Sequence, residues 1–174
     1  MGTTIDIRDE ETRDVRAIRE VNRLAFDGDL EGGIVDALRD HGVLMLSLVA
    51  AAGDEVVGHI AYSPLAVNDV AGAALGPMAV QPGHQRQGIG SALVRAGNQR
   101  LRDMGCPFIG VVGHPTYYPR FGFQRASGYG MTSEWDLPDD VFMVLVLDPA
   151  CAARLSGVAK YRHEFTTAAP SASD

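Results

Sequence analysis

A loop of glycines and polar residues in the middle of the chain has the composition of an anion-binding site. Its residues are Gln85, Arg86, Gln87, Gly88, Ile89, Gly90 and Ser91. An apolar stretch precedes the loop and an amphipathic stretch follows it, which is typical of a strand that leads into a helix. The first N–H groups of a helix lack intrahelical partners, and the helix dipole adds positive charge there. The sequence therefore predicts a phosphate site at this helix start.

Two common phosphate motifs do not fit this loop. A Walker P-loop requires a lysine after its last glycine, and none follows Gly90. A dinucleotide fingerprint requires a third glycine where Leu93 stands. The spacing Gln85-x-x-Gly88-x-Gly90 instead resembles the acyl-CoA loop of the GNAT superfamily of N-acyltransferases. The resemblance implies that acetyl-CoA is the cosubstrate and that residues 85–91 hold its diphosphate; the alternative is a glycine-rich turn before an ordinary helix.

Pro77 interrupts the strand that is expected over Ala73–Val80, directly before the loop. Proline lacks an N–H and is normally excluded from a central strand, so a β-bulge is expected here. In the GNAT family the corresponding strand is bulged and splays from its parallel neighbour, and the pantetheine arm pairs with it like an added strand. The resemblance thus assigns main-chain contacts with acetyl-CoA to Met78, Ala79 and Val80. The alternative is an edge strand that tolerates a proline.

A second motif, Gly113 to Phe123, contains a candidate proton donor. Tyr118, Gly122 and Phe123 match a Tyr-x-x-x-Gly-Phe pattern found in GNAT enzymes. The resemblance implies that Tyr118 contacts the CoA sulfur and acts as the general acid that protonates the departing thiolate. Free phenol and thiol pKa values lie near ~10 and ~8.5, so a hydrogen bond from the phenol would favour expulsion of the sulfur. The alternative is that Tyr118 only packs in an aromatic cluster.

The base that deprotonates an attacking amine is not assigned by the sequence. His114 follows the expected strand Phe108–Val112 at its carboxyl end, where α/β sites gather, but a polar residue before a proline is equally a helix cap. His59 lies on an expected strand, as core histidines do. Glu31 lies where GNAT acceptor loops usually occur, but the helix dipole alone explains an acidic first turn. The strand Ala73–Val80 holds no carboxylate, unlike the same strand in many relatives.

Composition limits the function classes. A formal net charge of −7 argues against nucleic-acid binding and is compatible with an amine-bearing acceptor, although solubility also explains it. Cys106 and Cys151 have neither disulfide nor metal spacing, and the histidines are scattered, so we expect no metal and no acyl-cysteine intermediate. The start Met1–Glu11 is too polar for a signal peptide, and no run approaches a membrane span. We therefore expect a cytoplasmic protein that does not bind membranes.

The hydrophobic pattern predicts an α/β fold: a strand, two helices, an antiparallel three-strand meander, the glycine loop with a long helix, a parallel strand, a short helix over Pro115–Phe121 and further strands. The middle strand of the meander is expected to be irregular at Gly58 and Pro64. The long helix is expected to bury Ile89, Leu93, Ala96, Leu101 and Met104. This order resembles the GNAT fold, a central mixed sheet with helices on both faces. Residues 1–167 are expected to form one domain, and residues 168–174 a disordered tail.

These observations predict an N-acetyltransferase that transfers an acetyl group from acetyl-CoA to an amine of a small molecule or peptide, by direct attack in a ternary complex. One alternative is a non-enzymatic acyl-CoA sensor, and another is a nucleotide-binding oxidoreductase, whose topology the meander does not provide. The loops Asp27–Glu31 and Ser127–Leu137 are expected to select the acceptor, without a readable code. A homodimer stays open.

Overall fold

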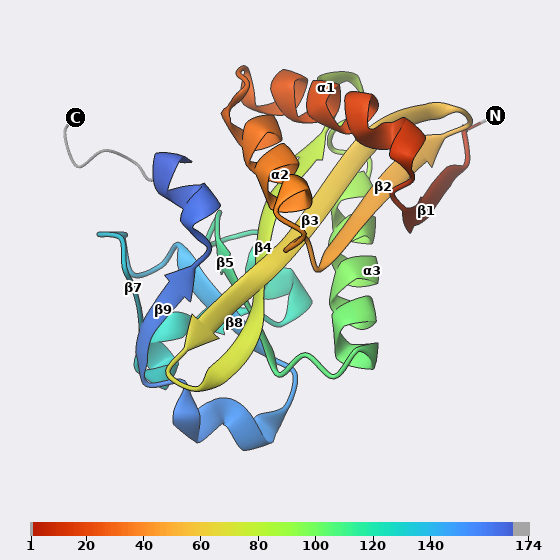
Figure 1. Cartoon of the computed structure of the whole chain (residues 1–174). Helices are drawn as coiled ribbons and strands as arrows, with labels where there is room; N and C mark the ends of the chain where they lie inside the picture. Colours follow the sequence, from red (N-terminus) through yellow and green to blue (C-terminus); the bar gives the residue numbers. More distant parts are fainter. Residues whose placement is uncertain (1, 169–174) are drawn as a thin grey trace. The chain divides into compact units, whose positions relative to one another are not determined.

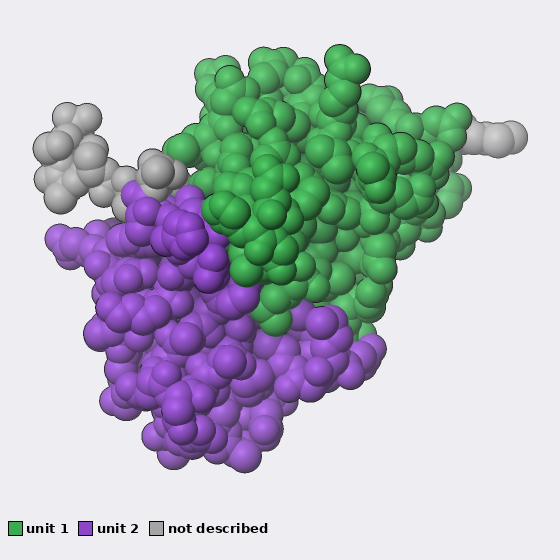
Figure 2. All heavy atoms as spheres, viewed as in Figure 1, with its two compact units in different colours: residues 1–62, 76–100 green, residues 63–75, 101–174 purple. Residues whose placement is uncertain are grey.

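The computed structural model describes residues 2–168, and its contacts divide the chain into two compact units (Figure 2). Unit 1 comprises residues 1–62 and 76–100, and unit 2 comprises residues 63–75 and 101–174. The single domain over residues 1–167 stays a prediction. Ala168, the first residue of the expected disordered tail, is instead the last residue of a 3-10 helix over His163–Ala168. The rest of the expected tail, from residue 169 onward, lies outside the described residues.

Figure 1 shows the helices and strands of the described residues. The strands are β1 Ile5–Asp9, β2 Leu46–Ala52, β3 Glu55–Val67, β4 Val70–Val80, β5 Phe108–Val112, β6 Gln124–Arg125, β7 Met131–Ser133, β8 Phe142–Val146 and β9 Gly157–Tyr161. The α-helices are α1 Val15–Phe26, α2 Leu30–Asp40 and α3 Ile89–Asp103. Short 3-10 helices are η1 Thr12–Asp14, η2 Pro82–His84, η3 Tyr118–Phe121, η4 Ala126–Tyr129, η5 Pro149–Arg154 and η6 His163–Ala168.

Unit 1 is a layered structure of helices on an antiparallel sheet. Strand β2 pairs with β1 on one side and with β3 on the other, both antiparallel. Helices α1 and α2 cover one face of these strands, and α3 covers the opposite face (Figure 1). The core between α1, α2 and the strands contains small and branched apolar side chains, namely Ile18, Val21, Val35, Val49, Val56, Ala61 and Ala79. Burial of these side chains stabilises the layer arrangement.

The buried face of α3 agrees with the expected stripe except at its end. Ile89, Leu93 and Leu101 are buried, and Ala96 is partly buried. The expectation that Met104 is buried is wrong, because its side chain is 56 % exposed. The helix ends at Asp103, so Met104 lies in the following turn and no longer follows the helical period.

Unit 2 contains the parallel pairing that the sequence predicted. Residues Ala73–Leu75 of β4 pair in parallel with β5, and β5 pairs antiparallel with β8, which in turn pairs with β6. Strand β9 pairs antiparallel with residues 65–67 of β3 and in parallel with β7. Parallel and antiparallel pairs occur in one sheet, so the predicted mixed α/β fold is confirmed.

The strand that contains Pro77 continues as one strand from Val70 to Val80, and its parallel pairing with β5 ends at Leu75, before Gly76 and Pro77. The bulge expected at Pro77 stays a prediction. A bulge does lie in the β2–β3 pair: Ala50 pairs with Gly58 and Ala51 with Val56, which leaves Val57 without a counterpart. The irregularity predicted near Gly58 is therefore confirmed.

The short helix expected over Pro115–Phe121 begins later, at Tyr118. Residues before it form a turn in which the Tyr117 N–H donates to the His114 carbonyl at 3.1 Å. Pro119 cannot donate a hydrogen bond, so it is tolerated only in the first turn of a helix, and a start at Tyr118 places it there.

Candidate functional site

The glycine loop in unit 1 presents a row of unpaired backbone donors. Within residues 2–168, the N–H groups of residues 86–90 have no hydrogen-bond partner. The first hydrogen bond of α3 runs from the Ala92 N–H to the Gly88 carbonyl, at 3.0 Å. We call the backbone of Arg86–Gly90 the phosphate cradle. Its donors sit at the start of a 15-residue helix, where the dipole favours an anion.

Side-chain hydrogen bonds hold the loop in this shape. The Gln85 amide donates to the Val80 carbonyl at 2.9 Å, and the Gln87 amide donates to the Gly83 carbonyl at 3.3 Å. The backbone is left-handed at Arg86, with φ of 62°, and at Gly88, with φ of 85°. A Cβ at Gly88 would meet no atom within 4 Å, so glycine is needed for its backbone angle and for the approach of a ligand.

The three residues of β4 that precede the loop differ in exposure. Ala79 is 2 % exposed and belongs to the core against α1 and α2, whereas Met78 is partly exposed. Val80 is buried, and its carbonyl accepts the hydrogen bond from Gln85. The side chains of Ala79 and Val80 are therefore unavailable to a ligand, which leaves backbone contacts as the role that these two residues can have.

Tyr118, in unit 2, lies in a cluster of aromatic rings. Its ring meets Tyr117 edge to face at a centroid distance of 5.1 Å and Phe123 at 5.7 Å. Burial raises the pKa of Tyr118 to about 12. Within residues 2–168 its hydroxyl makes no hydrogen bond and keeps some solvent exposure. The phenol is thus held protonated, with a donor that no neighbour in the described chain uses.

Gly113 leaves the space that the Tyr118 ring fills. A Cβ at Gly113 would lie 2.3 Å from Cε2 of Tyr118, far inside van der Waals contact. We expect Gly113→Ala to displace the ring and to lower the stability of unit 2 by about 1–3 kcal/mol, as overpacking does. Thermal unfolding measures this. Gly128→Ala is the matched control, because a Cβ there meets nothing within 4 Å, and an equal loss in both variants would contradict the packing role of Gly113.

The three base candidates have different environments. His114 is exposed, and its carbonyl accepts the turn hydrogen bond from Tyr117. Glu31 is partly buried in the first turn of α2. His59 is fully buried: its Nδ1 lies 3.2 Å from the Asn22 amide nitrogen and its Nε2 lies 2.8 Å from the Ser47 hydroxyl. His59 is therefore a hydrogen-bonded core residue rather than an accessible base.

A buried polar network continues from His59 to the surface of unit 1. The Ser47 hydroxyl donates to Glu10 at 2.5 Å, and Arg39 donates two hydrogen bonds to the same carboxylate, both at 2.9 Å. Burial alone would raise the pKa of Glu10, but these hydrogen bonds hold it below its ordinary value. Burial lowers the pKa of His59 to about 4, so the imidazole is neutral at pH 7.

This burial predicts a pH dependence of stability. In the unfolded chain the His59 imidazole has its ordinary pKa of 6.5, so the unfolded state binds more protons than the folded state between pH 6.5 and about 4. Stability is therefore expected to fall by roughly 2 kcal/mol from pH 7 to about pH 5. Urea unfolding at both values measures this. His59→Gln, which keeps a donor and an acceptor, should remove most of this slope; an unchanged slope would contradict the assignment to His59.

The two cysteines are buried and unsuited to nucleophilic attack. The Cys106 thiol donates to the Phe108 carbonyl at 3.3 Å, and burial raises its pKa. The Cys151 thiol lies 3.6 Å from the Pro107 carbonyl, and burial raises its pKa as well. Since the thiolate is the reactive form, this agrees with the expectation that no acyl-cysteine forms.

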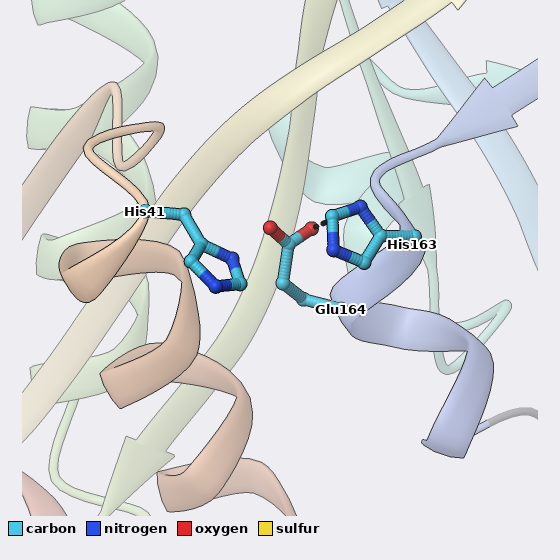
Figure 3. A group of neighbouring side chains, drawn as sticks. All are labelled: His41, His163 and Glu164. Carbon is cyan, nitrogen blue, oxygen red and sulfur yellow. Dashed lines mark ion pairs between the residues drawn. The ribbon is translucent and has the colours of Figure 1, made fainter.

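Figure 3 shows His163 and Glu164 side by side at the start of η6 in unit 2. It also labels His41, the residue that follows α2 in unit 1. The His163 Nδ1 lies 3.6 Å from the Glu164 carboxylate. Arg162 donates to the same carboxylate at 3.0 and 3.2 Å, which balances the charge of a side chain that is almost fully buried. The expectation that the protein needs no metal stays a prediction.

Comparisons with known proteins identify the class to which this fold and loop belong. The family model "Acetyltransferase (GNAT) family" matches residues 6–123. The chain is 31 % identical over 162 residues to the uncharacterized N-acetyltransferase YhbS of Escherichia coli strain K12, with coverage of 91 % of this chain and 97 % of that protein. This chain belongs to the GNAT family of acetyltransferases.

Two solved structures of this family carry the coenzyme. The crystal structure of Escherichia coli YhbS in complex with CoA has a TM-score of 0.91 at 30 % identity and covers 95 % of this chain and 94 % of that one. The structure of a GNAT family acetyltransferase from Brucella melitensis in complex with acetyl-CoA has a TM-score of 0.79 at 34 % identity and covers 94 % of this chain and 99 % of that one. Both likenesses extend over nearly the whole chain.

Sequence reasoning finds the loop and Tyr118 but misses residues that support them. In the sequence, Gly113 is recognised only as part of the motif Gly113 to Phe123, and no pattern singles out Gln81. For Gly58 the sequence does give an indication, because a glycine inside a strand often marks the close approach of another element.

Among the described residues, no helix combines the length and the apolar character needed to cross a bilayer.

Proposed function

We propose that this protein is an acetyl-CoA-dependent N-acetyltransferase that acts on the amine of a small molecule or peptide. The observation that carries the proposal is the phosphate cradle, a row of unpaired amides at the start of α3 in a chain of the GNAT family. The diphosphate of acetyl-CoA supplies the negative charge that such a row of donors binds. The solved relatives with CoA and acetyl-CoA support the same ligand.

The residues of the loop and of the end of β4 bind different parts of acetyl-CoA. The backbone N–H groups of Arg86–Gly90 bind the diphosphate, with Gln85 and Gln87 holding the loop and Ser91 completing the first turn of the helix. The backbone of residues 78–80 pairs with the pantetheine arm. Acetyl-CoA supplies the activated acetyl thioester, and the chain supplies orientation and proton transfer.

The reaction is a direct transfer of the acetyl group. The neutral amine nitrogen attacks the thioester carbonyl carbon, the C–S bond breaks, and the sulfur takes a proton from the Tyr118 phenol, which solvent then reprotonates. The amine proton passes to a base. His114, exposed after β5, is the candidate we favour over the buried His59, and Glu31 is its competitor. We further propose a cytoplasmic location and leave a homodimer as an alternative to a monomer.

Calorimetry and a thiol-release assay test this proposal together. Purified protein is titrated with CoA, acetyl-CoA and NAD, and CoA release from acetyl-CoA is then followed across a panel of amines. We expect binding of both CoA species, no binding of NAD, and amine-dependent thiol release. Binding without release for any amine would favour an acyl-CoA sensor, and preference for NAD would overturn the assignment.

A further inference from the structure

The chain segments before and after the glycine loop are both attached to the same segment of β3. Before the loop, directly after β4, Gln81 makes two hydrogen bonds to consecutive residues of β3. Its backbone N–H donates to the Val57 carbonyl at 2.9 Å, and its side-chain amide donates to the Val56 carbonyl at 3.0 Å. Two bonds to one segment fix both the place and the direction in which the chain leaves β4.

At the other end, the first turn of α3 rests on Gly58. A Cβ at Gly58 would lie 3.1 Å from Ile89 Cγ2 and 3.1 Å from Leu93 Cδ1, closer than ordinary side-chain contact. Ile89 and Leu93 are both buried. The helix start can approach the strand this closely because position 58 has no side chain.

The bulge in β3 brings these two attachments together. Val57 has no counterpart in β2, and its carbonyl is the one that accepts the Gln81 N–H. Val56, Val57 and Gly58 thus lie under the loop as three consecutive anchor points. We call Val56–Gly58 the β3 anchor.

We infer that Gln81 and Gly58 are positioning residues for the diphosphate of acetyl-CoA, acting through the β3 anchor. This inference rests on the proposed function. The anchor fixes the distance between Gln81, where the chain leaves β4, and the first turn of α3, so that the N–H groups of the phosphate cradle between them converge before the ligand arrives. Because these N–H groups are ordered before binding, acetyl-CoA binding does not lose affinity to the entropy cost of ordering them.

Two variants separate the attachments. Gln81→Met keeps the length of the side chain and the backbone bond but loses the side-chain donor to Val56. Gly58→Ala adds one methyl group between β3 and the first turn of α3. Gly33→Ala in α2 is the control, because a Cβ there meets nothing within 4 Å.

Each variant is titrated with CoA and with 3′-phosphoadenosine 5′-diphosphate, the nucleotide half of CoA that carries the diphosphate. We expect both positioning variants to weaken both ligands by about the same factor, roughly 10-fold. We also expect faster amide hydrogen exchange in residues 82–91 of the ligand-free Gln81→Met variant. Gly33→Ala should change neither ligand.

The outcomes distinguish the two proposals. If the wild-type protein binds no CoA, the proposed function itself is wrong. Wild-type binding with unchanged affinity in both variants overturns the positioning role alone. A loss for CoA without a matching loss for the nucleotide half overturns it too, since the anchor would then act on another part of the ligand or on stability in general.

Discussion

Gly88→Glu is expected to weaken CoA binding by at least about 100-fold. The glutamate would carry a negative charge into the row of donors to which we assign the diphosphate. Loss of two charge-assisted hydrogen bonds at about 1.5–3 kcal/mol each gives this factor. The left-handed backbone at position 88, with φ of 85°, adds strain for any side chain. Calorimetric titration with CoA measures the change.

Two further variants make the Gly88 experiment specific. Gly88→Gln introduces the same bulk without the charge, so the difference between the two isolates the electrostatic part. Gly83→Glu places an equal charge in the same loop outside the cradle, where a Cβ has open space, and should cost less than about 5-fold. Unfolding temperatures of the ligand-free variants check that the loop alone is altered. If the CoA affinity of Gly88→Glu lay within a few-fold of wild type, the assignment of the diphosphate to this loop would be wrong.

Local patterns predicted those parts of the molecule whose cause is local. The cradle depends on a strand, a helix start and Gly88, all within one short stretch, and α1, α2 and α3 follow from apolar periodicity. The parallel pairing of β5 with β4 follows from a strand–helix–strand order. These features need no knowledge of contacts distant in sequence.

Features that depend on distant partners were missed. Strand β9 forms against β3, more than 90 residues earlier in the chain, and its sequence alone has no strong strand alternation. The space at Gly113 matters only because the Tyr118 ring folds back onto it, and Gly58 matters only because α3 begins above it. A glycine in the sequence can indicate that another group approaches the backbone closely, but tertiary packing decides which group that is. The same reason explains why the base is still unassigned.

Tyr118→Phe is expected to lower kcat by about 100-fold and to leave the CoA affinity within about 2-fold. General acids contribute about 10²–10⁴-fold, and phenylalanine keeps the ring that packs on Tyr117 and Phe123 while removing the proton. Because burial raises the pKa of Tyr118 to about 12, the phenol stays protonated across the working range of pH. The rate of wild type should therefore show no loss from Tyr118 ionisation below about pH 10. Thiol release at saturating acetyl-CoA measures kcat.

A matched tyrosine separates loss of the proton from loss of packing. Tyr62→Phe removes a buried hydroxyl that donates to Asn98 within unit 1, outside the assigned site, and it should leave kcat unchanged. A leaving group of lower pKa needs less help from an acid, so an acetyl thioester of an aromatic thiol should react with Tyr118→Phe and wild type at similar rates. If Tyr118→Phe lowered the rate equally with acetyl-CoA and with the aromatic thioester, the tyrosine would act on the shape of the site. If neither did, the proton would come from elsewhere, and solvent would be the first group to test.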